Sequence, residues 1–454
     1  PYSVAVRDVR GAVPGPSIPL ADELQLVSQI SFSPNPDRFF FMTTDLHRGS
    51  LYIADLTGTP SAVKVVDGEL RGDRINPVHW SPDGTRFAYA KEVVTGSFQF
   101  ESFIAPADNP TQASPSLTSL PPGGLGQLSS SAGLWAPDSS RYVTISADGS
   151  NLFVSDRDGV STRIVLLDDN LAFASLIGWS PDSSLLIISA FDLTARGDRL
   201  YALNPDDDGP ATLALTPAEL PVNPGEVSIS PDGAGVAVGD VSGSWVFVAD
   251  LRSAQLAAPL QRIAGVAAFP GWSPDSRRLA VFTSNDGSQL DVYERDQPGT
   301  KVSVAVPLQG DFDFAHVQWS ADSQTLLAST NEGVFSLPAS GGAAALLLNE
   351  APRDYDLVPG ASPAFFYSDA TGVFALDATG APLSLDAHPE PWSLSVAHQR
   401  GAAFYFHFGD GTATGKLWMI DLAGAAPGPP VELLDFGQGS VTYDVSDATD
   451  VGPQ

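Results

Sequence analysis

Short stretches of alternating apolar and polar residues run along most of the chain, and turn residues separate them at regular intervals. Residues 271–282 show the pattern best: an apolar run ends at Trp272, four turn residues follow, and residues 279–282 are again apolar. Pro274 presets the backbone for a tight turn, and Asp275 can accept bonds from nearby backbone N–H groups. The stretch therefore predicts a strand end, a turn and a second strand.

The same turn phrase, Trp-Ser-Pro-Asp followed by Gly or Ser, returns along the chain. A variant lies at 30–34, and two degenerate copies lie near 362–367 and 396–400. A further apolar strand follows the copies, as at 51–55 and 152–156, so two patterns recur in a fixed order. The better copies of the phrase occupy 80–84, 135–139, 179–183, 229–233, 272–276 and 319–323.

These repeats predict an all-β fold. Successive copies are separated by about 36 to 55 residues, near the span of a propeller blade. A four-stranded unit cannot bury both of its faces alone, so each unit must stack on its neighbours. We count nine repeat units and expect a single β-propeller of four-stranded blades, with eight blades as the alternative.

Three segments follow from this organisation. Residues 1–23 contain an N-terminal strand and a Pro-rich lead-in, residues 24–436 form the propeller, and residues 437–454 hold a closing strand and a tail. The terminal strands either close the ring, one completing a blade that the other begins, or pair with the exposed edge of another subunit and give a homo-oligomer or polymer. The sequence leaves both alternatives open.

The acidic composition limits the classes of partner. The chain has 454 residues, with 23 basic against 53 acidic side chains and a formal net charge of −30. Such a surface repels nucleic-acid phosphates and anionic membranes, and it attracts cations such as Ca²⁺. We expect a protein partner and no nucleic acid, and the apolar runs are too short for a membrane span. Cysteine is absent, which excludes disulfides and thiolate metal sites.

One Asp-rich turn is a candidate cation site. Asn204, Asp206 and Asp208 place oxygen donors at positions 1, 3 and 5 of a calcium-loop pattern. Gly209 matches position 6, but Leu215 stands at position 12, where the pattern needs an acidic residue. A Ca²⁺ site at this turn and an ordinary Asp-rich turn therefore both remain open.

Patterns for catalysis are scarce. The Asp residues of the turn phrase lie one repeat apart, which favours turn residues over a catalytic set. No Gly-x-Ser-x-Gly elbow, phosphate-binding loop or dinucleotide fingerprint occurs. We predict no catalytic residue and no cofactor other than the candidate Ca²⁺. The Pro- and Ser-rich segment 108–133 is expected to form a long rim loop.

The turn phrase, followed by a Leu-Tyr-apolar-x-Asp strand, resembles the repeat of TolB-type propellers, also called PD40 or WD40-like. Residues 80–90, 179–189 and 272–282 carry the resemblance best, and it covers about 24–436. TolB-like propellers serve as periplasmic binding and assembly factors and as modules of proline-specific peptidases. The resemblance implies a non-enzymatic protein-binding, scaffold or assembly module in the periplasm or outside the cell.

Two other functions stay open. One is a structural subunit of an extracellular polymer that is joined through a terminal strand. The other is a Ca²⁺-dependent propeller enzyme of the lactonase or lyase type, which requires several acidic or amide groups converging on the central channel. The chain begins at Pro1 rather than Met, so we expect a processed or truncated form.

Overall fold

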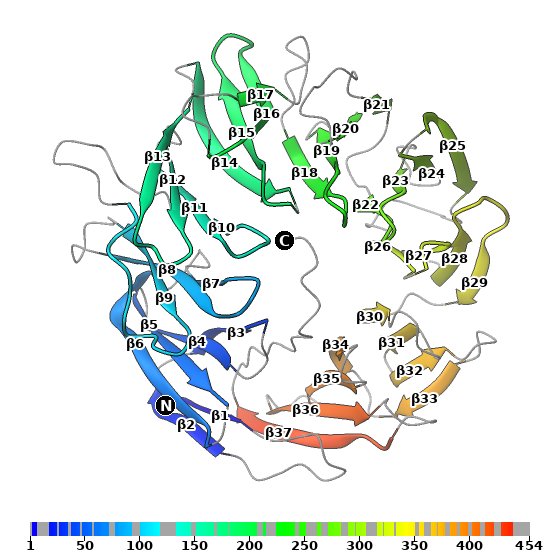
Figure 1. Ribbon diagram of the computed structural model, residues 1–454. Helices are drawn as coiled ribbons and strands as arrows, with labels where there is room; N and C mark the ends of the chain where they lie inside the picture. Colours follow the sequence, from blue (N-terminus) through cyan, green and yellow to red (C-terminus); the bar gives the residue numbers. More distant parts are fainter. Residues whose placement is uncertain are drawn as a thin grey trace.

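The computed structural model shows a chain built from β-strands (Figure 1). Within the described part of the chain every helix or strand element is a strand. The structure describes residues 2–6, 18–24, 27–34, 38–45, 48–56, 59–71, 78–92, 100–118, 133–146, 151–167, 170–180, 182–206, 212–214, 224–240, 245–250, 261–264, 271–282, 289–295, 297–305, 316–320, 322–330, 333–349, 354–357, 365–369, 371–376, 382–387, 391–397, 402–408, 414–421 and 428–438.

The described strands form eight four-stranded sheets, one three-stranded sheet and one two-stranded hairpin, and hydrogen-bonded neighbours follow one another in chain order. The hairpin is β1 (Tyr2–Val6) with β2 (Ile18–Leu24), and the three-stranded sheet is β7 (Val78–Trp80), β8 (Arg86–Glu92) and β9 (Phe100–Pro106). The four-stranded sheets are β3 (Val27–Phe32), β4 (Arg38–Asp45), β5 (Arg48–Asp55) and β6 (Ser61–Arg71); β10 (Leu134–Trp135), β11 (Arg141–Ile145), β12 (Asn151–Asp156) and β13 (Thr162–Leu166); β14 (Leu171–Trp179), β15 (Leu186–Asp192), β16 (Gly197–Leu203) and β17 (Thr212–Ala214); β18 (Pro224–Ile229), β19 (Gly235–Asp240), β20 (Trp245–Asp250) and β21 (Gln261–Ala264); β22 (Gly271–Trp272), β23 (Arg278–Phe282), β24 (Gln289–Glu294) and β25 (Gln297–Ala305); β26 (His316–Trp319), β27 (Thr325–Thr330), β28 (Gly333–Pro338) and β29 (Ala345–Leu348); β30 (Asp354–Leu357), β31 (Phe365–Asp369), β32 (Gly372–Leu376) and β33 (Pro382–Asp386); β34 (Pro391–Ala397), β35 (Ala402–Phe408), β36 (Thr414–Asp421) and β37 (Val431–Gln438).

Figure 1 shows these sheets in chain order around a common centre. The first strand of a sheet, such as β7 or β18, lies near the centre, and the last strand, such as β25 or β33, lies at the periphery. Every pairing within a sheet is antiparallel, as short connections between consecutive strands require. The prediction of an all-β, propeller-like chain is confirmed.

The apolar core lies between neighbouring sheets. Val143 of β11 and Leu186 of β15 belong to one buried cluster and are each 0% exposed. Alternation along a strand turns the next residue to the other face, so a single sheet contributes to two cores. Val143 thus packs towards the β14–β17 sheet, whereas Tyr142 packs with Ile104 of the β7–β9 sheet. This stacking explains why the repeats are apolar on both faces.

The three-stranded sheet has its outer edge covered by the segment after β9. Ser114 N–H donates to the Ile104 carbonyl at 2.7 Å, and Leu117 N–H donates to the Ser102 carbonyl at 2.9 Å. Leu117 is buried in the cluster that also contains Tyr142. The described part of the predicted 108–133 rim loop is therefore a packed edge segment, and residues 119–132 lie outside the described residues.

The N-terminal strand β1 pairs with β2 in the same chain, with Val6 opposite Ile18. Leu20 of β2 packs on the buried Phe39 and Phe41 of β4, so the hairpin contacts the first four-stranded sheet. The predicted C-terminal closing strand lies beyond residue 438, outside the described residues. Pairing of a terminal strand with another subunit stays a prediction.

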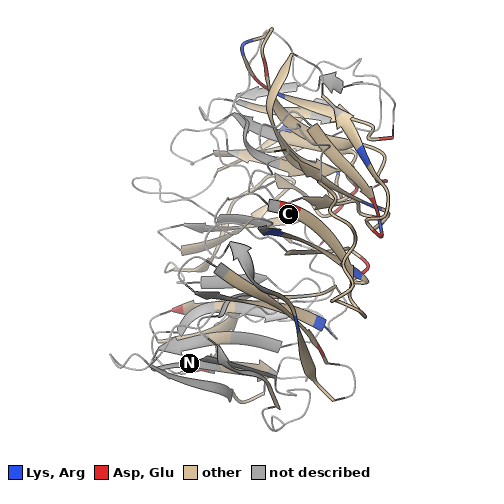
Figure 2. Cartoon of the chain, turned by 90° about the vertical axis from the view of Figure 1, so that its left-hand side faces the viewer, with Lys and Arg blue, Asp and Glu red and all other residues tan. Residues whose placement is uncertain are grey.

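Charged side chains concentrate at the ends of the sheets. Figure 2 views the sheets edge-on and shows Lys, Arg, Asp and Glu of the described residues mostly at turns and strand ends, with the strands between them largely free of charge. The described residues contain no helix of the length and hydropathy that a membrane span requires. Charged groups of the described residues that could form a site therefore lie mainly at the turns.

Candidate functional site

The copies of the turn phrase that carry Ser in second place fold into the same hydrogen-bonded turn. The copy at 135–139 has Ala136 there, and its Asp138 accepts the Ser140 hydroxyl instead. In the copy at 80–84 the Ser81 hydroxyl donates to Asp83 Oδ1 at 2.7 Å, and Thr85 N–H donates to the same oxygen at 3.0 Å. The Arg86 N–H in turn donates to the Ser81 hydroxyl at 2.9 Å. This arrangement closes the turn and aligns the strand that follows. The corresponding carboxylates are Asp182, Asp232, Asp275 and Asp322, each accepting a Ser hydroxyl two residues earlier.

These carboxylates are held in the ionised form. The hydroxyls of Ser180 and Ser184 and the Ser184 N–H lower the pKa of Asp182. Partial burial opposes ionisation of Asp83, but the hydroxyl of Ser81 and the other bonds within the turn bring its pKa below the usual value. A carboxylate that is already engaged by several donors is a poor general acid or base at neutral pH. The geometry supports the prediction that the Asp residues of the phrase are turn residues.

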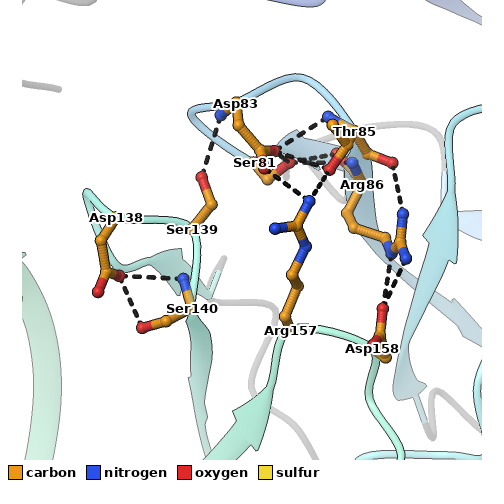
Figure 3. A network of polar contacts seen from close by, with 9 residues as sticks. All are labelled: Ser81, Asp83, Thr85, Arg86, Asp138, Ser139, Ser140, Arg157 and Asp158. Carbon is orange, nitrogen blue, oxygen red and sulfur yellow. Dashed lines mark hydrogen bonds and ion pairs between the residues drawn. The ribbon is translucent and has the colours of Figure 1, made fainter.

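The phrase also links a sheet to the next one along the chain at several junctions. The Asp83 N–H donates to the Ser139 hydroxyl at 3.0 Å, across the junction between the β7–β9 and β10–β13 sheets (Figure 3). Ser139 has a φ of 60°, a left-handed conformation that turns its hydroxyl towards the preceding sheet. The same bond recurs from Asp138 to Ser183, from Asp232 to Ser276 and from Asp275 to Ser323.

The Trp of the phrase makes a second link, in this case from its indole N–H to a backbone carbonyl of the preceding sheet. Trp319 Nε1 donates to the Gly271 carbonyl at 3.2 Å, and the ring is 8% exposed. A buried indole N–H normally requires such an acceptor. The other donor–acceptor pairs are Trp80 with Ser31, Trp135 with His79, Trp179 with Leu134 and Trp272 with Ser228.

Arginines add a third set of links at the same end of the sheets. Arg157 pairs with Asp83 at 2.7 Å, and Arg86 pairs with Asp158 at 2.6 Å, so two ion pairs cross one junction (Figure 3). Arg295 pairs with Asp232 of the preceding sheet at 2.8 Å. The Arg157 and Arg86 pairs are partly exposed to solvent, and pairs of that kind contribute at most about 1 kcal/mol each. The end of the sheets that carries the turn phrase, called the phrase end below, is thus a belt of polar contacts that joins neighbouring sheets.

The predicted calcium turn carries a different set of contacts. The Asn204 side-chain oxygen accepts the Asp206 N–H at 3.0 Å. The Asp206 carboxylate pairs with Arg141 of the preceding sheet at 2.5 Å. Asp208 lies outside the described residues. Among the described residues no group of three metal-binding side chains occurs, and the Ca²⁺ site stays a prediction.

Sequence reasoning missed a buried polar cluster at the opposite end of the β14–β17 sheet. Asp192 ends β15 and accepts bonds from Arg199 Nη1 at 2.8 Å and from Tyr201 Oη at 2.9 Å. The N–H groups of Thr194 and Ala195 donate to the same carboxylate at 2.8 and 2.9 Å. The cluster fixes the loop 193–196 between β15 and β16. The available sequence signal was Asp192 followed by Arg199 and Tyr201 on the next strand of the hairpin.

The same end of this sheet exposes two large apolar side chains. Phe173 of β14 is 75% exposed and has a φ of 55°, a conformation that residues other than glycine rarely adopt. Leu193 follows Asp192 and is 52% exposed, and its N–H donates to the Asn170 carbonyl at 2.8 Å. Register places Ala172 opposite Phe191, so both exposed residues lie near one end of one hairpin. A strained, exposed aromatic residue is a candidate for binding.

Solved structures resemble this chain, although no family model and no curated protein sequence matches it. The crystal structure of a eukaryotic initiation factor covers 92% of this chain and 92% of its own, with 9% identity and a TM-score of 0.51. The β-propeller domain of Cps50 (Swd1) from Myceliophteria thermophila covers 67% and 92%, with 11% identity and a TM-score of 0.37. A chain named TolB, from Agrobacterium tumefaciens, covers 61% and 85%, with 15% identity and a TM-score of 0.29.

The first of these likenesses spans nearly the whole chain and, at 9% identity, concerns the fold alone. The other two superpose too loosely to support an argument. Antiparallel sheets in chain order around a centre, together with the whole-chain likeness, show an all-β chain of the propeller type.

Proposed function

We propose that this chain is a non-enzymatic, exported protein-binding scaffold, and that its sheets form one propeller of nine blades. The β1–β2 hairpin is not hydrogen-bonded into any of the nine larger sheets, which supports the count of nine. The engaged carboxylates of the turn phrase support a structural rather than a catalytic belt. Export to the periplasm or cell exterior rests on the TolB-type resemblance of the repeats.

The observation that carries the proposal is the exposed pair Phe173 and Leu193 on a fixed hairpin. Asp192 ties down the loop that presents Leu193, so little conformational entropy is lost when a partner binds. An exposed aromatic ring supplies a large contact area from a side chain with few rotatable bonds. The partner that fits is a protein with an apolar patch to cover Phe173 and Leu193. Its surface should be net positive, because this chain has a formal net charge of −30.

The experiment is affinity co-purification from an extract of the producing organism, with the intact protein, Phe173→Ser, Leu193→Ser and Val160→Ser as baits. Val160 is the matched control, because it is 76% exposed but lies in the turn after β12, at the phrase end. We expect the intact protein and the Val160→Ser control to recover the same partner. The Phe173→Ser and Leu193→Ser baits should recover about tenfold less of it or lower, as for the loss of a central apolar contact.

The unfolding temperatures of all four baits are measured as well. Equal values show that any lost binding does not come from a folding defect. The proposal is wrong if no partner is retained, or if the Phe173 and Leu193 variants retain the same proteins as the control. Raising the salt concentration should slow association, because opposite net charges steer the two proteins together.

A further inference from the structure

At one junction between two better copies of the turn phrase, the positions equivalent to those that make the three polar links elsewhere carry no side chain able to make them. This junction lies between the β14–β17 sheet and the β18–β21 sheet. Ile229 stands where the other five better copies have Trp, so this position offers no indole N–H. Gly233 stands where the copies at 135, 179, 272 and 319 have Ser (the copy at 80 also has Gly), so this position offers no hydroxyl to the Asp182 N–H. Leu185 stands at the position of Arg86 and Arg141 and carries no charge.

The two flanking junctions show what is missing. On one side the Asp138 N–H donates to Ser183 at 3.1 Å, and Trp179 donates to the Leu134 carbonyl. On the other side the Asp232 N–H donates to Ser276 at 2.9 Å. Links of both kinds therefore join the sheets before and after this junction, which we call the seam.

Apolar packing occupies the seam. A Cβ at Gly178 of β14 would lie 2.7 Å from Cδ1 of Ile229 in β18, so these two strands approach each other closely. Ile187 holds the repeat position of Val143, whose side chain packs against the following sheet, and Ile187 is 0% exposed. Val236 holds the position of Leu279, which packs against the preceding sheet, and Val236 is 1% exposed. Within the described residues, these faces meet without the serine and indole bonds that occur at the two flanking junctions.

We propose that the seam is a built-in opening point, at which the β14–β17 and β18–β21 sheets separate more readily than their neighbours do. Local opening follows the places with the fewest stabilising contacts. Apolar contact is non-directional, so two such faces can slide or part without breaking a specific bond. Opening uncovers Ile187 and Val236 while the sheets on either side stay linked by the turn phrase.

The absence of cysteine makes the test direct, because any introduced cysteine is the only thiol in the protein. Ile187→Cys and Ile188→Cys form a matched pair: the residues are adjacent in β15, are both 0% exposed, and lose the same side chain. Ile188 belongs to the core shared with the preceding sheet, whereas Ile187 faces the seam. Reaction with an excess of thiol reagent under native conditions reports how often each site opens.

We expect the thiol at position 187 to react about tenfold faster or more than the thiol at 188, since each missing hydrogen bond contributes measurably to closure. Val236→Cys tests the other side of the seam against Leu279→Cys. Leu279 loses more volume on substitution, so any cavity effect favours faster reaction of this control. Equal rates, or faster reaction at 188 and 279, would overturn the proposal.

Restoring a link gives an independent arm. Gly233 has a φ of 55°, close to the 60° of Ser276, so Gly233→Ser can place a hydroxyl as the other copies do. Added to Val236→Cys, it should slow the reaction of that thiol severalfold and leave the Leu279→Cys rate unchanged. Ser276→Gly should speed the reaction at 279. No change in either rate would contradict the role of the serine links at the seam.

Discussion

The backbone N–H of Asp275 donates a hydrogen bond of 3.0 Å to the hydroxyl of Ser323, one sheet further along the chain. The carboxylate of the same Asp275 accepts the Ser273 hydroxyl at 2.6 Å within its own turn. One residue thus closes a turn with its side chain and joins two sheets with its backbone. The repeat of this arrangement explains why the turn phrase recurs with so little change.

The indole link predicts a specific loss of stability. Replacing Trp319 with Phe keeps an aromatic ring in the core but removes the donor to the Gly271 carbonyl. The carbonyl loses its partner in a buried position and the smaller ring leaves a small cavity, so we expect about 1 to 3 kcal/mol less free energy of unfolding. Urea titration measures it. A loss below about 0.5 kcal/mol would mean that the bond contributes little.

Acid should weaken the Asp192 cluster. Burial disfavours the charged carboxylate, but the Ala195 N–H and the Arg199 side chain outweigh it and lower the pKa of Asp192 to about 2. The folded-state pKa lies below the ordinary value of 3.8, so the cluster stabilises the fold above pH 3.8. That contribution, about 2 kcal/mol, disappears as the pH falls from 3.8 towards 2.

Thermal unfolding between pH 5 and 2 measures this effect, with Asp192→Asn as the comparison. The variant should be less stable at pH 7 and should lose less stability on acidification than the parent protein. Parallel pH curves for the two proteins would show that Asp192 is not a source of acid sensitivity.

Calcium removal tests the Asp-rich turn. Asp206 is already paired with Arg141, so we expect the unfolding temperature to be the same in EGTA and in excess Ca²⁺. Arg141→Ala frees the carboxylate and should make any Ca²⁺-dependent rise larger than in the parent. A rise of several degrees with Ca²⁺ in the parent protein would instead support a calcium site at Asn204, Asp206 and Asp208.

The repeats made the fold predictable, because a turn phrase and a strand in fixed order specify strand number and pairing locally. The turn role of Asp83 and its counterparts was predictable for the same reason. The partners across the junctions were not, since the bond from Asp83 to Ser139 joins residues 56 positions apart. The exposure of Phe173 was also hidden, because an apolar residue in a strand is ordinarily read as core.

The free energy of unfolding of a variant without the linking serine hydroxyls tests the central claim that the turn phrase joins the sheets. The variant carries Ala at all four linking serines, Ser139, Ser183, Ser276 and Ser323. We expect its free energy of unfolding to fall by about 4 kcal/mol, about 1 for each distant site. The control carries Ala at the exposed Ser175 and Ser384, and should stay within about 0.5 kcal/mol for each site. A four-serine loss no greater than that of the control would contradict the account.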